Sequence, residues 1–238
     1  MTDQVVRIAL LGAESTGKTT LSIGIAQALH SLGLKAVAVP ETLREWCHAN
    51  GRTPEVHEQA DIAKAQAENI FSISSGWVIA DTSPLMTAVY SDYMFQDKGL
   101  YQQALLHQAA FDLTLLMGLD LDWVADGVQR DGEHVREPVD TLLRQALQGA
   151  KLPFQVIYGR SEARLSAALM AIHERVGAVH TELGPHLTAL KSLQSQRDAN
   201  QYGLNKGKTA WRCDLCSDAE CEHKLFSDLL KAEGSMKS

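Results

Sequence analysis

The sequence contains no apolar run long enough to cross a membrane, and the run near its start, residues 5–11, is far too short to do so. The start also lacks the charged segment followed by an apolar segment that marks a secretory signal. Internal repeats and low-complexity tracts are absent too. We therefore expect neither a membrane-spanning protein nor a secreted or repeat protein.

Cysteine and positive charge are scarce as well. The chain has 4 cysteines, one isolated at position 47 and three near the end, a pattern unlike that of a disulfide-stabilised secreted domain. A reducing cytoplasm is the compartment that this pattern favours. The 22 lysines and arginines are outnumbered by 29 acidic residues, and a net charge of −7 argues against a broad nucleic-acid surface. Nucleic acid is thus not the expected partner, and the oligomeric state stays open.

What the chain does have is a regular alternation of short apolar segments and helical periods. Five apolar segments, at about 5–11, 35–40, 77–82, 111–119 and 152–159, predict strands, and the intervening segments have helical periodicity. One of these helical segments, residues 53–76, has Pro54 at its start, a position that proline favours in helices. Such alternation is typical of an α/β fold with a mostly parallel five-stranded sheet covered by helices. It stops near residue 180. We predict a main domain over residues 1–180 and a small helical, Cys/His-rich extension over 181–238.

A phosphate-binding pattern follows the first predicted strand. "GAESTGKT" matches G-x-x-x-x-G-K-[ST], and its position between a strand and a helix is that of a P-loop. Backbone N–H groups of such a loop converge on phosphate oxygens, helped by the dipole of the following helix. We expect Lys18 to reach the terminal phosphates of ATP and the Thr19 hydroxyl to bind Mg²⁺. The residues that would form this ATP site are Gly12, Ala13, Glu14, Ser15, Thr16, Gly17, Lys18, Thr19 and Thr20.

Polar residues directly after the second and third predicted strands are further candidates, because ligands of open parallel sheets bind at the carboxyl ends of the strands. Asp81 ends the third strand, where a carboxylate can hold Mg²⁺ or accept a proton from the attacking hydroxyl. It could instead cap the next helix, but Ser83 before Pro84 is the better cap. Glu41, after the second strand, competes for the role of base and for substrate binding. Arg44 is either a substrate contact or a solvated charge.

The segment from Asp126 to Arg136 is rich in glycine and charge, and such a composition suits a lid that closes over phosphates. It could bring Arg130 and Arg136 to the developing negative charge and Asp126 to the substrate. An ordinary charged surface loop is the alternative. The later segment "YGRSEAR" is similar to the loop on which many P-loop kinases stack adenine, although Arg160 and Arg164 could equally be surface charges.

Taken together, "GAESTGKTTL", "VPETLREW", "ADTSPLMTAVYSDY", "WVADGVQR" and "LPFQVIYG" resemble, in order and spacing, the ribosylnicotinamide kinase domain of NadR-type proteins. The similarity covers roughly residues 5–178. The resemblance implies ATP-dependent phosphorylation of the 5′-hydroxyl of nicotinamide riboside, a step of NAD salvage. The chain departs from the family pattern at Ser83, where Asp is frequent, and at Gln129, where the family often has the lid arginine.

A cysteine cluster lies in the extension. Cys213, Cys216, Cys221 and His223 form a C-x2-C-x4-C-x-H arrangement, and three thiolates with one imidazole complete a tetrahedral zinc site. All four ligands would come from the protein, so the zinc would be structural. Reduced surface thiols are the alternative.

These features lead to a first hypothesis and two alternatives. The first is a small-molecule kinase that uses Mg-ATP on a nucleoside-like hydroxyl. An ATP-dependent switch or adaptor that acts through a partner protein is the second, and a zinc-dependent nucleic-acid binder is the third. A kinase releases ADP faster when its substrate is present, whereas a switch needs its partner.

Overall fold

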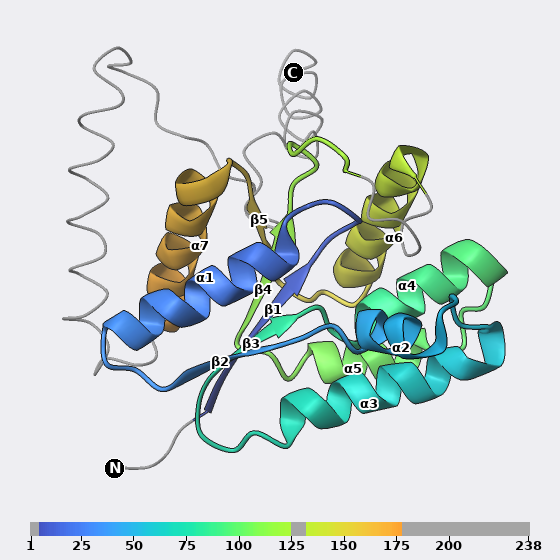
Figure 1. Cartoon of the computed structure of the whole chain (residues 1–238), viewed down its shortest axis with the longest axis horizontal. Helices are drawn as coiled ribbons and strands as arrows, with labels where there is room; N and C mark the ends of the chain where they lie inside the picture. The colour runs from blue at the N-terminus through green and yellow to red at the C-terminus, as the bar shows by residue number, and fades with distance from the viewer. Residues whose placement is uncertain (1–4, 125–131, 178–238) are drawn as a thin grey trace, which may run out of the picture.

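The computed structural model describes residues 5–124 and 132–177, which form a parallel sheet with helices on both faces (Figure 1). All strand pairs are parallel, and the strand order is β2-β3-β1-β4-β5. The strands are β1 (Val5–Leu11), β2 (Ala36–Val39), β3 (Gly76–Asp81), β4 (Leu113–Met117) and β5 (Gln155–Ile157). The five strands and the α/β class predicted from the sequence are confirmed.

The helices bury the two faces of the sheet in separate cores. One core lies between the sheet and helices α1 and α7, and it includes Ile8, Ile25 and Ile172. On the other face, a core under α4, α5 and α6 includes Leu11, Leu85 and Leu143. A smaller core on that face, beside α3, includes Ile70 and Val78. Elements of the described chain are α1 (Lys18–Ser31), α2 (Thr42–Asn50), η1 (Val56–Glu58), α3 (Gln59–Phe71), α4 (Pro84–Phe95), α5 (Tyr101–Gln108), η2 (Glu133–Val135), α6 (Arg136–Gly149) and α7 (Ser161–Val176).

The start of α4 agrees with the sequence prediction. Ser83 is the N-cap, its hydroxyl oxygen accepts a hydrogen bond from the Leu85 N–H at 3.2 Å, and Pro84 occupies the first turn. Ser83 Oγ also donates to Gln108 at 2.6 Å. Because Ser83 caps the helix, Asp81 is available for other contacts.

The start of α3 differs from the prediction that Pro54 opens this helix. The α-helix begins only at Gln59, after the single 3-10 turn η1. Glu55 and Glu58 form a capping box around that turn, and the Glu55 N–H donates to the Glu58 carboxylate at 2.8 Å. This local arrangement delays the α-helix by several residues.

The sheet register brings the carboxyl ends of the central strands together. Leu10 of β1 pairs with Asp81 of β3, and Leu11 pairs with Leu116 of β4. The loops after these strands therefore lie next to one another, which places the phosphate-binding loop beside Asp81. The predicted domain boundary near residue 180 and the extension beyond it lie outside the described residues and stay predictions.

Within residues 5–124 and 132–177, every helix is too short or too polar to span a lipid bilayer.

Candidate active site

The loop between β1 and α1 has the geometry that its glycines predict. Gly12 has φ +146° and Gly17 has φ +79°, backbone conformations that side chains with a Cβ rarely adopt. A Cβ at Gly12 would also lie 2.9 Å from the Met117 Cβ of β4. Both glycines are thus needed for the loop to turn tightly against the sheet.

Lys18 lies buried inside this loop. Its Nζ donates to the carbonyl oxygens of Gly12 at 2.8 Å and Ala13 at 3.0 Å. Burial lowers the pKa of Lys18 below its ordinary value, while the carboxylates of Glu41 and Asp81 oppose that shift. The ammonium group is therefore held between the loop and a group of acidic side chains, where an incoming phosphate would complete its environment.

Thr19 and Asp81 form a hydrogen-bonded pair next to Lys18. The Thr19 hydroxyl donates to Asp81 Oδ2 at 2.6 Å, and Asp81 is only 2% exposed. The other carboxylate oxygen, Oδ1, is buried and has no hydrogen-bond partner in the described part of the chain. Hydroxyl and carboxylate oxygens are the ligands that Mg²⁺ prefers, and the unpaired Oδ1 leaves coordination capacity. The residues present fit a magnesium site.

Arg44 completes the group of residues predicted after the strands. Its Nη1 donates to the Thr19 hydroxyl oxygen at 2.8 Å, and its Nη2 pairs with Glu41 Oε2 at 3.0 Å. Glu41 precedes α2 and Arg44 lies one turn into it, so the start of this helix carries both groups to the phosphate-binding loop. The guanidinium group thus contacts the same hydroxyl oxygen that is expected to bind magnesium.

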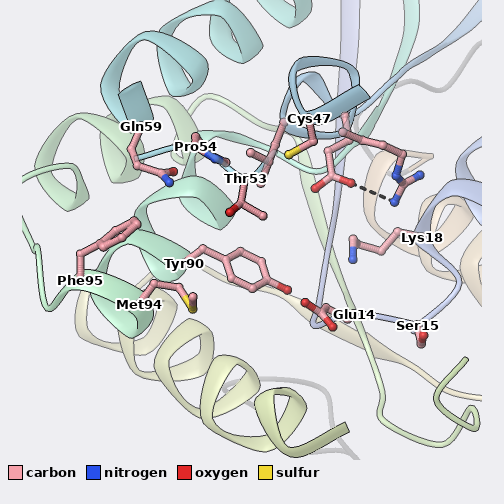
Figure 2. Close-up of a pocket in the computed structure, with 13 residues that line it drawn as sticks. Glu14, Ser15, Lys18, Cys47, Thr53, Pro54, Gln59, Tyr90, Met94 and Phe95 are labelled. Carbon is pink, nitrogen blue, oxygen red and sulfur yellow. Dashed lines mark ion pairs between the residues drawn. The ribbon is translucent and has the colours of Figure 1, made fainter. Parts of the chain in front are cut away.

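A pocket opens between α2, α4 and the loop, and we call it the α2–α4 pocket (Figure 2). Lys18 and Ser15 lie at one end in Figure 2, Gln59 and Phe95 lie at the other end, and Tyr90 lies between them. Its lining residues are Glu14, Ser15, Lys18, Glu41, Leu43, Arg44, Cys47, Thr53, Pro54, Gln59, Tyr90, Met94 and Phe95.

Sequence reasoning missed the middle of this pocket and the end opposite Lys18. Gln59, Tyr90 and Phe95 come from two helices that are separated along the chain, and no spacing pattern connects them. Cys47 was noted only as an isolated thiol, yet it is buried and lines the same pocket. Burial raises the pKa of the Cys47 thiol, and the nearby Glu41 carboxylate raises it further.

A second cavity lies on the opposite side of the loop, between α1 and α7, and we call it the α1–α7 groove. Gly17, Thr19 and Thr20 of the loop and first helical turn form one wall. Leu121, after β4, and the segment 160–165 form the other. The "YGRSEAR" segment, which resembles an adenine-binding loop, therefore does border a cavity beside the phosphate-binding loop.

The two arginines of that segment have different environments. Arg160 is exposed and pairs with Asp122 Oδ2 at 3.1 Å. Arg164 is 3% exposed and cannot be a surface charge, which corrects one of the two sequence-based alternatives for it. It donates to the Thr16 carbonyl at 2.9 Å and the Gly159 carbonyl at 2.7 Å, and it pairs with Asp120. Arg164 thus connects α7 to the phosphate-binding loop.

Of the predicted lid residues, only Arg136 lies in the described chain. It is buried, and its Nη2 donates to the carbonyl oxygens of Leu119 at 3.2 Å and Leu121 at 2.7 Å. In this structure Arg136 therefore holds the loop that follows β4. Its action on a transferring phosphoryl group stays a prediction, and the candidates Asp126 and Arg130 lie outside the described residues.

The predicted zinc ligands Cys213, Cys216, Cys221 and His223 also lie outside the described residues, so structural zinc stays a prediction. In the part of the chain that the structure does describe, no three His, Cys, Asp or Glu side chains cluster in a way that could hold a metal ion.

Comparison with solved structures places the fold among known ones. NadR protein in complex with NR aligns with a TM-score of 0.56 and 22% identity, over 74% of this chain and 50% of that one. The chain thus spans half the length of that NadR chain. Deoxyadenosine kinase from M. mycoides with bound dCTP aligns over 71% of this chain and 100% of its own, with a TM-score of 0.48 and 16% identity.

Shikimate kinase from Acinetobacter baumannii, in complex with shikimate, aligns over 74% of this chain and 96% of its own, with a TM-score of 0.39 and 13% identity. At TM-scores below 0.5, the alignments with this enzyme and with the deoxyadenosine kinase say nothing more specific about the chain. No curated protein sequence matches it significantly.

The parallel sheet, the loop around Lys18 and the Thr19–Asp81 pair define a P-loop nucleotide-binding protein with a kinase-like fold. The chain belongs to the AAA domain family, whose pattern matches residues 7–164. The resemblance to a NadR-type domain that was predicted from the sequence is confirmed at the level of the fold.

Proposed function

We propose that the protein is an ATP-dependent small-molecule kinase that phosphorylates the 5′-hydroxyl of nicotinamide riboside or a similar nucleoside. One observation carries the proposal: the phosphate-binding loop lines a cavity on each of its two sides. Gly17 and Thr19 border the α1–α7 groove, while Glu14, Ser15 and Lys18 border the α2–α4 pocket. A phosphoryl transfer enzyme needs a donor site and an acceptor site that meet at the phosphates.

The α1–α7 groove is the donor side in this proposal. Its walls would hold the adenosine of ATP against Leu121 and the segment 160–165, with the phosphates on the loop N–H groups and Lys18. Thr19 and Asp81 would hold Mg²⁺, which when bound neutralises charge on the phosphate oxygens. The buried, unpaired Oδ1 of Asp81 supports this assignment.

The α2–α4 pocket is the acceptor side in this proposal, and its lining supports Glu41 rather than Asp81 as the base. Glu41 lines the pocket, whereas Asp81 is hydrogen-bonded to Thr19 and is not part of the pocket wall. We therefore assign proton acceptance from the 5′-hydroxyl to Glu41 and metal binding to Asp81. Arg44, which pairs with Glu41, would keep the carboxylate oriented until the acceptor enters.

The chemistry of the pocket suits a cationic aromatic acceptor. The Tyr90 and Phe95 rings supply aromatic surface, and the carboxylates of Glu14 and Glu41 are matched by the positive charges of Lys18 and Arg44. An aromatic cation is favoured by the rings, through stacking and cation–π contacts. Nicotinamide riboside carries a positively charged pyridinium ring, so it combines the features that this pocket would select.

The test is ADP release from Mg-ATP with a panel of nucleosides led by nicotinamide riboside, with mass spectrometry of the products. We expect a phosphorylated nucleoside with the wild-type protein and none with Lys18→Met. ATP binding without phosphorylation of any panel member would overturn the kinase proposal. ADP release that depended instead on an added protein partner would favour the switch hypothesis.

A further inference from the structure

Gln59 is a buried side chain that no part of the proposed reaction uses. It is the first residue of α3, is 5% exposed and lines the α2–α4 pocket. Its Oε1 is fully buried and has no hydrogen-bond partner within the described chain. Buried polar groups are normally paired, because an unpaired one loses its hydrogen bonds to water without replacement.

Two other buried glutamines show how such a group is normally satisfied in this protein. Gln66, two turns further along α3, accepts from the Thr42 N–H at 2.7 Å and donates to the Pro40 carbonyl at 3.3 Å. Gln108 accepts from Ser83 at 2.6 Å and donates to Thr114 at 2.8 Å. Both ends of each of these carboxamides are paired, so Gln59 stands out against a direct internal comparison.

The position of Gln59 indicates that a ligand in the pocket could supply its missing hydrogen bond. At this end of the pocket Pro54 and Phe95 are apolar and offer no side-chain hydrogen bond, and no side chain of the described chain, the Thr53 hydroxyl included, pairs with Gln59 Oε1. In Figure 2 the carboxamide lies at the end of the pocket opposite Lys18. A polar group placed in an apolar pocket wall typically fixes the orientation of a ligand.

We propose that Gln59 recognises the base of the acceptor through a paired hydrogen bond. A carboxamide presents one acceptor and one donor side by side, so its complement is a ligand edge with an N–H next to a carbonyl or ring nitrogen. The carboxamide of a nicotinamide ring has this edge, and so does the amide or amidine edge of a nucleobase. This inference rests on the proposed function, which makes the pocket the acceptor site.

The layout of the pocket matches the layout of a nucleoside. Lys18 is at the end where phosphate is transferred, Tyr90 lies midway, and Gln59 is at the far end. A nucleoside has its 5′-hydroxyl at one end and the polar edge of its base at the other. Binding with the 5′-hydroxyl toward Lys18 therefore brings the base edge to Gln59.

The experiment compares nicotinamide riboside with pyridinium riboside, which lacks the carboxamide, in the wild-type protein and in Gln59→Leu. Affinity is measured by calorimetry, and kcat/KM is measured where turnover occurs. In Gln59→Leu we expect nicotinamide riboside to lose about tenfold or more in both, because a hydrogen-bonded recognition edge is removed. For pyridinium riboside, the affinity and kcat/KM should change by less than about twofold, because this compound has no carboxamide for Gln59 to bind.

Controls separate recognition from folding. Gln59→Met keeps the length of the side chain and removes both hydrogen-bonding groups without adding charge, so it should also lose affinity for nicotinamide riboside. Gln145→Leu, the same substitution at an exposed position of α6, should leave the affinity for both ligands unchanged. Thermal unfolding of each variant shows whether the fold is kept.

Cytidine and inosine are included because their hydrogen-bonding edge includes a ring nitrogen, whereas nicotinamide presents a carboxamide outside its ring. They show which of the two kinds of edge Gln59 recognises. Loss of affinity for cytidine or inosine in Gln59→Leu, with nicotinamide riboside unaffected, would assign the ring edge to Gln59. Equal losses for nicotinamide riboside and pyridinium riboside would overturn the inference, as would no loss for any probe or no binding of any probe to the wild-type protein.

The two proposals fail in different ways. If the wild-type protein phosphorylates one or more of the probes and Gln59→Leu does so equally well with all of them, the kinase stands and the recognition role falls. If the wild-type protein binds nicotinamide riboside without phosphorylating it and Gln59→Leu loses that binding, the recognition role stands and the kinase falls.

Discussion

Glu41 and Asp81 are two carboxylates near the same lysine, but each has different neighbours. Substitution of Glu41 and substitution of Asp81 should therefore affect different steps, catalysis in one case and metal binding in the other. Glu41→Gln is expected to lower kcat by about 10²-fold or more, because it removes the proposed general base. It should leave the Mg²⁺ dependence of ADP binding nearly unchanged. Asp81→Asn should weaken that Mg²⁺ dependence, since it removes charge from the proposed metal site. Calorimetry with ADP at several Mg²⁺ concentrations, together with steady-state kinetics, measures both effects.

The opposite result would exchange the two roles. If Asp81→Asn reduced kcat with Mg²⁺ dependence intact, and Glu41→Gln weakened metal binding, then Asp81 would be the base. Ser72→Ala, at an exposed position after α3, serves as a neutral control.

The Cys47 thiol offers a readout of pocket occupancy. Burial raises its pKa, so at pH 8 it holds less thiolate than a free cysteine and should react slowly with iodoacetamide. The rate should rise with pH and continue to rise above the ordinary pKa of a thiol, since the folded protein holds the proton more tightly. An acceptor nucleoside should slow the reaction because Cys47 lines the pocket. Mass spectrometry of the peptide that contains Cys47 measures the rate.

Fast labelling of Cys47 at pH 7 would contradict the buried, raised-pKa environment. Labelling that is slow but insensitive to every acceptor tested would show that those compounds bind elsewhere.

At the scale of helices and strands, Arg164 makes a connection that can be tested by stability. Its guanidinium group joins α7 to the carbonyl oxygens of Thr16 and Gly159 and to Asp120 after β4. Arg164→Leu should lower the free energy of unfolding by about 2–3 kcal/mol, because it leaves these groups unpaired; the partial exposure of Asp120 reduces the effect. Urea unfolding followed by circular dichroism measures the change.

Arg160→Leu is the matched control on the same segment. Its ion pair with Asp122 is exposed on both sides, so the change should be within about 0.5 kcal/mol. Equal effects of the two substitutions would mean that the buried contacts of Arg164 contribute little to stability.

Elements were predictable from the sequence where one local signal dominated. The strands were found because each is a short continuous apolar run, as residues 76–81 show, and the start of α4 was found because Ser83 and Pro84 both mark a helix start. The start of α3 was misplaced at Pro54, since the capping box between Glu55 and Glu58 creates a separate turn.

The site was predictable only in part for a similar reason. Lys18, Thr19 and Asp81 follow strands whose ends meet in any parallel sheet of this kind, so sequence order was enough to bring them together. Gln59 and Phe95 line the same pocket only because α3 and α4 pack side by side in three dimensions, and nothing in their sequence positions indicates this.

At the scale of the whole molecule, Arg44 connects the α2–α4 pocket with the α1–α7 groove. It pairs with Glu41, which lines the pocket, and contacts Thr19, which lines the groove. Its guanidinium contacts the Thr19 hydroxyl oxygen at 2.8 Å, and a metal ion on that oxygen would be repelled by the positive charge. Arg44→Met should therefore strengthen Mg²⁺ binding in the presence of ADP by about fivefold, which corresponds to ~1 kcal/mol. A calorimetric titration of Mg²⁺ into the protein–ADP complex measures this.

Arg52→Met is the control, because Arg52 pairs with Glu58 at 2.7 Å and is not part of the pocket wall. Weaker Mg²⁺ binding in Arg44→Met would show instead that Arg44 moves onto the phosphates when the nucleotide binds.

The phosphate-binding loop is a wall shared by the α1–α7 groove and the α2–α4 pocket. If the two cavities hold the two reactants, one molecule that joins an adenosine and a nucleoside through a short polyphosphate would occupy both at once. The second half of such a bisubstrate ligand would bind at a high effective concentration, so the whole would bind far more tightly than either half. The length of the polyphosphate linker, which must match the span of the shared loop, is therefore the first variable to optimise in such an inhibitor.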